Sequence, residues 1–260
     1  MSIANAGHDE RGKYSGGKAG DQTGSEWEVR SWYNRPWNFV ARFDKAVGVD
    51  IAKLARNAAN NNHIGYDQSQ RISFWELLKN TKNYDPANIT KNCESDCSAG
   101  VASIVKAVGY RKDLTKLKNV PVSMWTGNER ETLRKAGATI LTDSKYLSSD
   151  AYLLPGDILC NEAHHTCINL TTGSKVKTST GTPSGTKYYV KAKALNVRNM
   201  PSTAKSGTKV VGILHKNDVV YLTNIKTNSY GNTWGKISYG TYKGSYIAIK
   251  YNDEVFAKKA

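Results

Sequence analysis

The stretch Asp96-Cys97-Ser98-Ala99-Gly100-Val101 decides how the first part of this 260-residue chain folds. Asp96 has a side chain that suits a helix N-cap, because its carboxylate can accept hydrogen bonds from free backbone N–H groups. The apolar residues that follow recur at helical spacing and predict one buried face: Val101, Ile104, Val105 and Val108. The stretch therefore predicts a helix that begins at Cys97.

A cysteine at the start of a helix is a candidate nucleophile. The unpaired N–H groups and the positive end of the helix dipole there favour thiolate over thiol. The same N–H groups can stabilise an oxyanion. Most cysteines at such places are small buried hydrophobes, so a catalytic role for Cys97 requires a partner base.

His165 is the candidate base. Residues 156–160 and 166–170 predict a β-hairpin with its turn near Glu162. Strand alternation puts Ile168 and Leu170 on one side and His165 with Cys167 and Asn169 on the other. If the first side points away from the helix of Cys97, His165 faces that helix.

The order of the patterns predicts two domains. Residues 39–60 show the periodicity of one or two helices and residues 72–82 that of another, so the part before residue 175 is of the α+β class. A segment rich in Ser, Thr, Gly and Pro predicts a linker at 176–186. Residues 187–260 hold short β-type runs and predict a small all-β barrel; the runs are 194–198, 209–214, 219–225, 234–238 and 246–250.

The chain carries a formal charge of +15, which predicts attraction to a polyanion. Residues 187–260 contain 13 Lys or Arg against 3 Asp or Glu, and 8 of the 15 tyrosines. Nucleic acid, an anionic membrane surface and a teichoic-acid-bearing wall all fit this charge, but no nucleic-acid-binding motif is present. The chain also lacks an apolar run long enough for a membrane span or a signal peptide.

The residues around the candidate pair resemble the NlpC-type cysteine peptidases, papain-like peptidoglycan hydrolases related to the CHAP amidases. The resemblance spans about residues 60–178, and its motifs are Ile64-Gly65-Tyr66-Asp67, Asp96-Cys97-Ser98, Pro155-Gly156-Asp157-Ile158-Leu159 and His165-Thr166-Cys167-Ile168-Asn169. The last motif stands where the family has H-V-G-I-Y. The stretch Gly20-Asp21-Gln22-Thr23-Gly24 is similar to one in phage lysins with this catalytic domain.

The resemblance implies that Cys97 attacks a peptide carbonyl and that His165 takes its proton and passes it to the leaving amine. A third polar residue then orients the imidazole. The family's position for that residue falls on Lys177, which cannot accept the imidazole N–H. Asn169 is the candidate we carry forward; Asn161, Glu162 or a residue of the N-terminal segment could serve instead.

The resemblance also implies the substrate-binding residues. Tyr66, Asp96 and Ser98 flank the nucleophile in the motifs, while glycines around Asp21 and Gln22 would let these two side chains approach a cleft closely.

Cys93, Cys97, Cys160 and His165 could alternatively supply four ligands to a zinc ion. The spacing C-x-x-x-C at a helix start is not that of a zinc knuckle, so we expect no metal and no cofactor.

The second domain resembles the bacterial SH3-like wall-binding modules. Ala194-Leu195-Asn196-Val197-Arg198-Asn199-Met200-Pro201-Ser202 stands where these modules have A-L-N-V-R-S-G-P-S. The resemblance implies a ligand groove lined by aromatic side chains, here Tyr221, Trp234, Tyr239 and Tyr246.

The sequence thus predicts an endolysin, a monomeric peptidoglycan hydrolase that cuts an amide bond in the stem peptide. Both N-acetylmuramoyl-L-alanine amidase and γ-D-glutamyl endopeptidase activities fit. We expect it to stay in the host cytoplasm until lysis and then to act on the wall of a Gram-positive cell, with no nucleic-acid partner. The alternative is a non-catalytic cell-wall-binding protein with a structural N-terminal domain.

Overall fold

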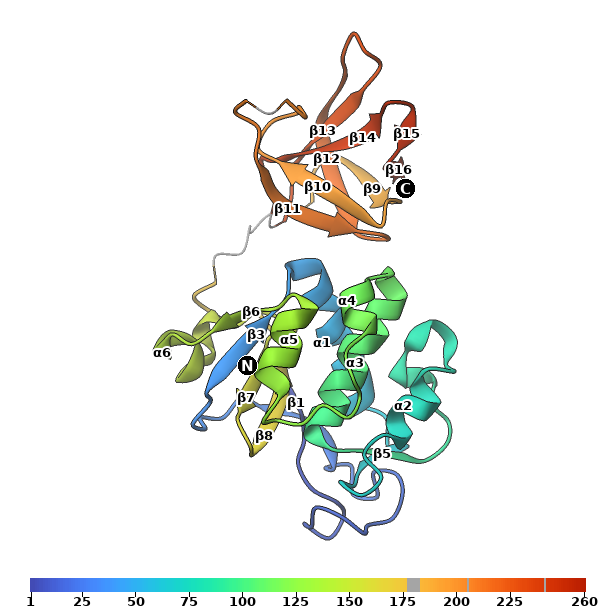
Figure 1. Cartoon of the computed structure of the whole chain (residues 1–260), viewed down its shortest axis with the longest axis vertical. Helices are drawn as coiled ribbons and strands as arrows, with labels where there is room; N and C mark the ends of the chain where they lie inside the picture. Colours follow the sequence, from blue (N-terminus) through green and yellow to red (C-terminus); the bar gives the residue numbers. More distant parts are fainter. Residues whose placement is uncertain (177–182, 205, 241) are drawn as a thin grey trace. The chain divides into compact units, whose positions relative to one another are not determined.

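The computed structural model describes residues 1–176, 183–204, 206–240 and 242–260, which belong to two compact units, Met1–Val176 and Lys177–Ala260 (Figure 1). Each unit has a hydrophobic core of its own. Residues 177–182 of the predicted linker lie outside the described residues. None of the helices in the described ranges is both long and apolar enough to span a membrane.

The N-terminal unit is built on one six-stranded sheet in which every neighbouring pair is antiparallel. Its spatial order is β2 (Trp27–Ser31), β1 (Ser2–Ala6), β8 (His165–Asn169), β7 (Ile158–Asn161), β3 (Phe39–Arg42) and β6 (Thr139–Leu141). The first strand of the chain therefore lies beside the last strand of the unit (Figure 1). This pairing brings residues from the two ends of the unit together.

Six α-helices surround this sheet: α1 (Lys45–Ala59), α2 (Ser73–Leu78), α3 (Cys97–Lys112), α4 (Thr115–Lys118), α5 (Glu129–Ala136) and α6 (Ser144–Leu147). A small parallel pair, β4 (Ile64–Tyr66) and β5 (Cys93–Ser95), precedes α3. Short 3₁₀ turns lie at Lys82–Tyr84, Pro86–Asn88 and Asp150–Tyr152. The mixture of helices with an antiparallel sheet confirms the α+β class.

The two faces of the sheet pack against different neighbours. On the α3 face, Ala4 and Ile168 join the side chains of α1, α3 and α5 in the main core. On the α6 face, Ile3 and Cys167 pack with Trp37 in a smaller cluster that Leu147 of α6 borders. The central strands β1, β8, β7 and β3 are therefore buried on both faces, whereas the edge strands β2 and β6 are partly exposed.

Helix α3 begins where the sequence predicts. Asp96 accepts a hydrogen bond from the Ala99 N–H at 2.7 Å and caps the helix. Gly100 lets this end approach β2, because a Cβ there would lie 2.4 Å from the Trp27 ring. Asp113, with φ of 57°, ends the helix in the left-handed conformation.

The predicted hairpin is confirmed as β7 paired with β8, whereas the helix predicted over residues 39–60 is only partly right. Residues 45–59 form α1, but Phe39–Arg42 form strand β3 between β7 and β6. Phe39 and Ala41 face the α3 side and Val40 the α6 side. A strand buried on both faces is continuously apolar and has no period-2 pattern to distinguish it from a helix.

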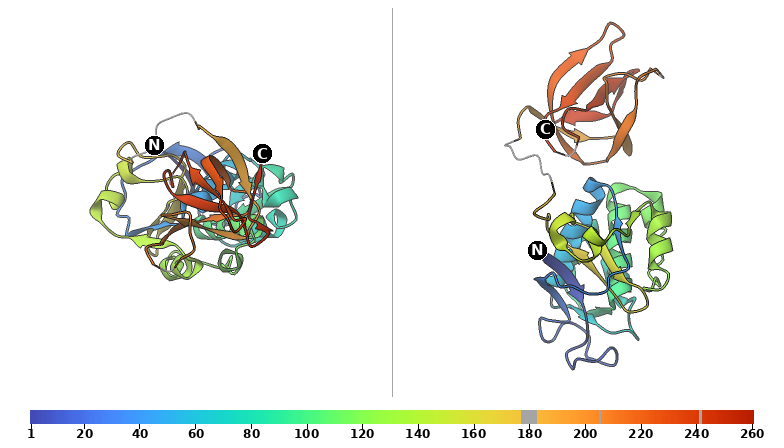
Figure 2. Two further views of the ribbon diagram at one scale, coloured as in Figure 1. Left: turned by 90° about the horizontal axis from the view of Figure 1, so that it is seen from above. Right: turned by 90° about the vertical axis from the view of Figure 1, so that its left-hand side faces the viewer.

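The C-terminal unit is all β, as predicted. Its main path runs in the order β11 (Val210–His215), β10 (Ala194–Arg198), β14 (Tyr246–Tyr251), β13 (Thr233–Ile237), β12 (Val219–Thr227), β9 (Thr186–Val190) and β16 (Ala257–Lys259), and β15 (Glu254–Val255) pairs with β14. The sheet curls around an apolar core that contains Val197, Leu222 and Ile247 (Figure 2). Strand β9 is a strand that the sequence patterns missed.

Candidate active site

The structure joins His165 to a residue of the first strand. The imidazole Nε2 lies 2.8 Å from Oδ1 of Asn5, and the Tyr33 hydroxyl donates to the same oxygen at 3.3 Å. Because an amide oxygen can only accept, Nε2 of His165 carries the proton and Nδ1 is left free as a base. His165 is 7% exposed, so this orientation is held within a packed environment.

Cys97 meets the sheet where β1 and β8 separate. The ladder between these strands pairs Ile3 with Asn169 and Ala4 with Ile168. The Asn169 N–H points to the β7 side, so alternation turns the Thr166 N–H toward the β1 side. This N–H is hydrogen-bonded to the Cys97 sulfur. The nucleophile candidate is therefore bonded to the residue next to His165.

The alternation predicted for β8 is confirmed, but the expected facing of His165 is wrong. Ile168 packs on the α3 face, while Cys167 packs on the α6 face together with Trp37. The rings of Trp37 and His165 lie 6.3 Å apart, which puts His165 on the α6 side too. His165 is the first residue of β8 and adjoins Thr166, beyond the last residue pair of the β1–β8 ladder.

Burial determines the protonation states of Cys97 and His165. It raises the pKa of the Cys97 thiol to about 12, and the negative charge of Asp96 adds to the rise, while the N–H groups of Thr166 and Ser98 oppose it. Burial also lowers the pKa of His165 to about 4, helped by the positive charges of Arg35 and Arg30. The resting pair is a neutral thiol and a neutral imidazole, so the thiolate expected from the helix start is not the resting form.

The other candidates for the third residue lie elsewhere. The amide of Asn169 donates to the carbonyls of Leu154 and Thr171 at 2.7 and 2.6 Å. Asn161 donates to the Pro36 carbonyl, and Glu162 forms a bidentate pair with Arg130. Lys177 lies outside the described residues. Among these described side chains, only Asn5, from the N-terminal segment, accepts from His165.

Asp96 and Ser98 are held by an arginine that sequence patterns did not reveal. Arg71 lies 2.7 Å from Asp96 Oδ2 and donates to Ser98 Oγ at 2.9 Å. Its guanidinium also donates to the Met124 carbonyl at 2.6 Å. The polar atoms of both candidates are thus used to fix the head of α3 and the segment that precedes α5.

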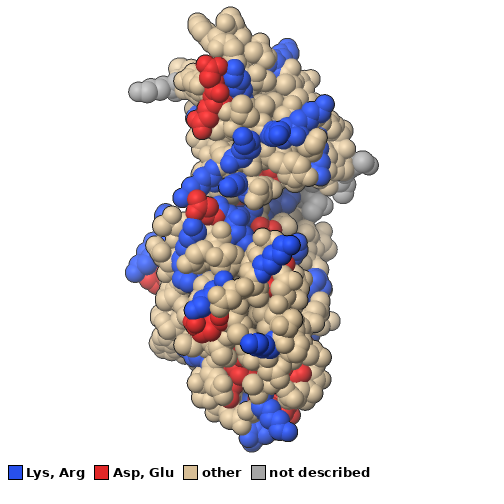
Figure 3. Space-filling model, turned by 90° about the vertical axis from the view of Figure 1, so that its right-hand side faces the viewer, with Lys and Arg blue, Asp and Glu red and all other residues tan. Residues whose placement is uncertain are grey.

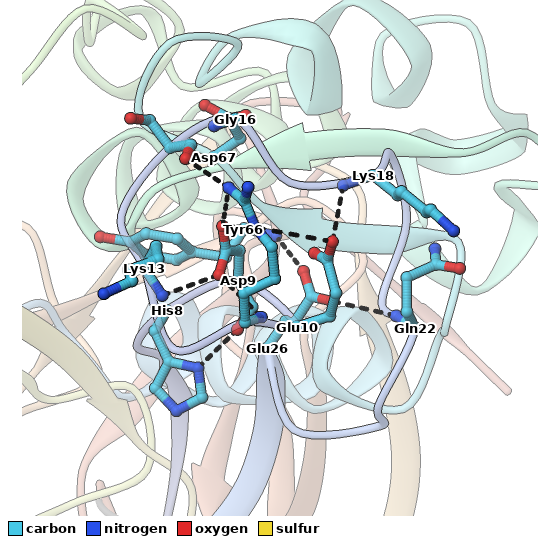
Figure 4. A network of polar contacts seen from close by, with 12 residues as sticks. His8, Asp9, Glu10, Lys13, Gly16, Lys18, Gln22, Glu26, Tyr66 and Asp67 are labelled. Atoms are coloured by element: carbon cyan, nitrogen blue, oxygen red, sulfur yellow. Dashed lines mark hydrogen bonds and ion pairs between the residues drawn. The ribbon is translucent and has the colours of Figure 1, made fainter.

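Tyr66, Asp21 and Gln22 meet around a buried glutamate. Glu26 accepts from the backbone N–H groups of Gln22 and Tyr66 at 3.0 and 2.9 Å (Figure 4). Asp21 accepts from the N–H groups of residues 25–27, and the Gln22 side chain donates to the carbonyls of Ala19 and Gly20. Both side chains stabilise their own loop.

Tyr66 is the member of this group that adjoins Cys97, the candidate nucleophile. Its ring is 3% exposed, and the pKa of its hydroxyl is raised by burial and then by the neighbouring Cys97. Gln68 donates to the hydroxyl at 3.2 Å. Tyr66 thus shares the surroundings of Cys97 with Asp96 and Ser98.

A pocket of about 480 Å³ lies on the α6 side of the site. Residues 34–37 line it on one side, and Ser144, Leu147 and Ser148 line it on the other. Trp37 connects this pocket to the His165 ring, and Arg35 supplies a positive charge. No carboxylate in the described ranges forms an ion pair with Arg35.

In the C-terminal unit the predicted aromatic residues divide into two sets. Tyr221 and Tyr239 pack edge to face at 6.1 Å, and Tyr246 lies under the Lys236 ammonium at 5.8 Å; all three are partly exposed. Trp234 is 5% exposed and packs against Tyr251. On the face drawn in Figure 3, Lys and Arg are more abundant than Asp and Glu.

All four cysteines are buried and free. Over the described ranges no group of three or more His, Cys, Asp or Glu side chains is placed to hold a metal ion.

Comparison with known proteins identifies the family of the N-terminal unit. The family model of the endolysin-like domain matches residues 3–176, which is about two thirds of the chain. These bounds coincide with the unit that holds Cys97, His165 and Asn5. No curated protein and no solved structure matches the chain. The chain belongs to the endolysin-like domain family.

Proposed function

We propose that this protein is a cysteine amidohydrolase that cuts an amide bond in the stem peptide of peptidoglycan. The observation that carries the proposal is the hydrogen bond between Asn5 and His165 beside a cysteine at the head of α3. Membership of the endolysin-like domain family supports peptidoglycan as the substrate. Nucleophile, base and orienting residue are the three parts that covalent acyl transfer requires.

In the proposed mechanism, Nδ1 of His165 takes the proton of the neutral thiol as Cys97 Sγ attacks the peptide carbonyl. The backbone N–H groups of Cys97 and Ser98 at the start of α3 stabilise the oxyanion. The imidazolium then gives its proton to the leaving amine, which leaves a thioester on Cys97. A water molecule that His165 deprotonates hydrolyses the thioester and restores the thiol. Asn5 holds the ring in one tautomer throughout.

Charge supports an anionic substrate on the α6 side. Arg35 and Arg30 both raise the potential at His165, and Arg30 is already paired with Glu28 at 3.0 Å. Arg35 is therefore the cation available to the stem peptide, which carries carboxylates. The pocket beside Trp37 is large enough for part of a peptide.

The proposal is tested by the products of digestion. Purified walls treated with the full chain should release muropeptides with one new amine and one new carboxyl end, identified by mass spectrometry. The mass of each product also decides between the amidase and the endopeptidase. Glycan fragments with new reducing ends, or binding with no release, would reject amide hydrolysis.

Asn5→Ala should lower kcat/KM by at least about tenfold, because the imidazole loses the acceptor that fixes its tautomer. Asn5→Asp keeps an acceptor and should retain more activity at neutral pH. Its carboxylate stabilises the imidazolium, so the acid limb of the pH profile should move to higher pH. Rates on soluble muropeptides between about pH 4 and pH 9 give both answers. Equal rates for Asn5→Ala and wild type would show that Asn5 does not orient His165 for catalysis.

We further propose that the C-terminal unit binds the wall of a Gram-positive cell through an SH3-like barrel. Support comes from its curled all-β sheet, its excess of Lys and Arg, and the partly exposed Tyr221, Tyr239 and Tyr246. Anionic wall polymers are complementary to this charge.

A fragment of residues 183–260 should therefore pellet with purified walls, and the bound fraction should fall as salt rises from about 0.1 M to about 0.5 M, because screening weakens the attraction. Residues 1–176 are the matched control and should remain in the supernatant. If residues 1–176 pellet with the walls and residues 183–260 do not, wall binding belongs to the N-terminal unit.

A further inference from the structure

Behind the candidate active site lies a buried carboxyl group that the mechanism above does not use. Glu129 is the first residue of α5 and is 0% exposed. Its neighbour Arg130 pairs with Glu162, at 2.8 and 3.0 Å. In the described ranges Glu129 itself forms no ion pair with a cation. An ionised carboxylate in this position would be a buried charge without a counterion.

The hydrogen bonds around Glu129 can be counted. Thr166 Oγ1 lies 2.8 Å from Glu129 Oε1 and 2.9 Å from the Leu159 carbonyl oxygen. A threonine hydroxyl has one hydrogen, and the carbonyl can only accept. Each contact is a full two-centre hydrogen bond when the hydroxyl donates to Leu159 and a protonated carboxyl donates to the hydroxyl, whereas an ionised carboxylate would have to share the single hydrogen with the Leu159 carbonyl. The geometry therefore favours a protonated Glu129.

The remaining neighbours are compatible with a neutral acid. Cys160 Sγ lies 3.7 Å from Glu129 Oε2 and can donate to it. Cys97 and Asp96 lie near on the α3 side, and Asp96 is paired with Arg71. Burial raises the pKa of Glu129 to about 8, which agrees with the hydrogen count at neutral pH.

Thr166 connects this acid to the nucleophile. Its side chain is held by Glu129, and its backbone N–H is bonded to the Cys97 sulfur. A negative charge on Glu129 raises the pKa of Cys97, since like charges oppose formation of the thiolate. Ionisation would also draw the single hydrogen of the Thr166 hydroxyl to the carboxylate and away from the Leu159 carbonyl. Both effects act against attack by Cys97.

We propose that Glu129 is a positioning residue that works as a neutral carboxylic acid, holding Thr166 in place for Cys97, and that its ionisation turns the site off. This inference rests on the proposed roles of Cys97 and His165. It predicts that activity falls at alkaline pH because Glu129 ionises, and not because Cys97 or His165 titrates.

The test is the pH profile of kcat/KM on soluble muropeptides, measured with the full chain. Wild type should lose activity above about pH 8, whereas its acid limb should fall near the His165 pKa of about 4. Glu129→Gln can still donate to Thr166 and accept from Cys160, so it should keep neutral-pH activity within a few fold and lose the limb near pH 8. Glu129→Ala should lose at least about tenfold at every pH.

Glu131→Gln is the matched control, because Glu131 is an exposed residue of the same helix that pairs with Arg134. It should keep the alkaline limb of wild type. The proposal is overturned if Glu129→Gln keeps that limb, or if it is as inactive as Glu129→Ala. If the alkaline limb persists in Glu129→Gln but disappears in Glu94→Gln, the titrating group is Glu94, whose pKa burial also raises to about 8.

A second measurement does not depend on activity. The pKa of Glu129 is higher in the folded protein than its ordinary value of 4.5, so the stability that its protonated form contributes is full below about pH 4.5 and is lost as pH rises toward 8. The Tm of Glu129→Gln relative to wild type should therefore increase between pH 5 and pH 8.5. A constant difference would mean that Glu129 is ionised throughout. An inactive wild type with the expected Tm shift would instead reject the proposed hydrolase.

Discussion

Cys97→Ser is expected to lower wall hydrolysis by at least about 10³-fold, because residues that act as one catalytic unit lose nearly all of their effect together. The serine hydroxyl has a much higher pKa than a thiol and is a poor nucleophile when its base is a single imidazole. Burial already holds the thiol in its neutral form, so the reaction depends on transfer of the proton to His165. Release of muropeptides from purified walls measures the loss.

Cys93→Ser provides the matched control for this substitution. Cys93 is also buried, lies in β5 just before α3, and donates from its sulfur to the His63 carbonyl at 3.5 Å, a role that serine can fill. It should retain activity within a few fold. Wall binding and Tm should change little in Cys97→Ser. Activity of Cys97→Ser within a few fold of wild type would exclude Cys97 as the nucleophile.

His165→Ala is expected to be as damaging as Cys97→Ser, since neither residue works without the other. His165 is buried and bonded to Asn5, whereas the adjacent His164 is exposed in the β7–β8 turn. His164→Ala should therefore keep activity within a few fold. Because the two substitutions are at adjacent positions in one hairpin, a loss of activity in His165→Ala alone would show that its imidazole is required. A similar loss in both variants would indicate a general effect on the hairpin.

The double variant adds a sharper check. Cys97→Ser combined with His165→Ala should be hardly less active than either single variant, because the second change removes a base whose nucleophile is already lost. Multiplicative losses would indicate that the two residues act independently. A larger loss of activity in His164→Ala than in His165→Ala would identify His164 as the general base instead of His165.

The helices and strands that sequence patterns predicted well are those whose start, end and apolar pattern can be recognised within a few consecutive residues. Helix α3 carries its N-cap, Asp96, next to its first apolar turn. The β7–β8 hairpin and the strand Ala194–Arg198 show alternation bounded by turn residues. Strand β3 has no such signal, because Val40 and Phe39 are buried on opposite faces and look like part of a helix.

The proposed orienting residue, Asn5, is identified only by pairing between distant strands. Asn5 stands as a polar residue among apolar ones in Ser2–Ala6, which marks a buried polar group but not its partner. Only the placement of β1 beside β8 assigns that partner as His165. Arg71 and Glu129 were missed for the same reason, since both contact residues that lie more than 20 positions away along the chain.

Protonation was the other feature that spacing did not predict. A helix start favours a thiolate when the cysteine is in contact with water. Cys97 is only 8% exposed, and burial outweighs the two N–H groups that point at its sulfur. Depth of burial is set by the packing of the whole unit, and motif spacing carries little information about it.

The pairing of β1 with β8 also determines when the proposed site can be assembled during synthesis. Asn5 and His165 are 160 positions apart, so a ribosome finishes Cys97 and all of α3 well before the base has been made. Strand β1 must remain without its central neighbour until β8 emerges, and closing so long a loop makes this late step slow compared with helix formation. On the proposed mechanism, the nascent chain thus carries its nucleophile without a base from the synthesis of Cys97 until β8 has emerged.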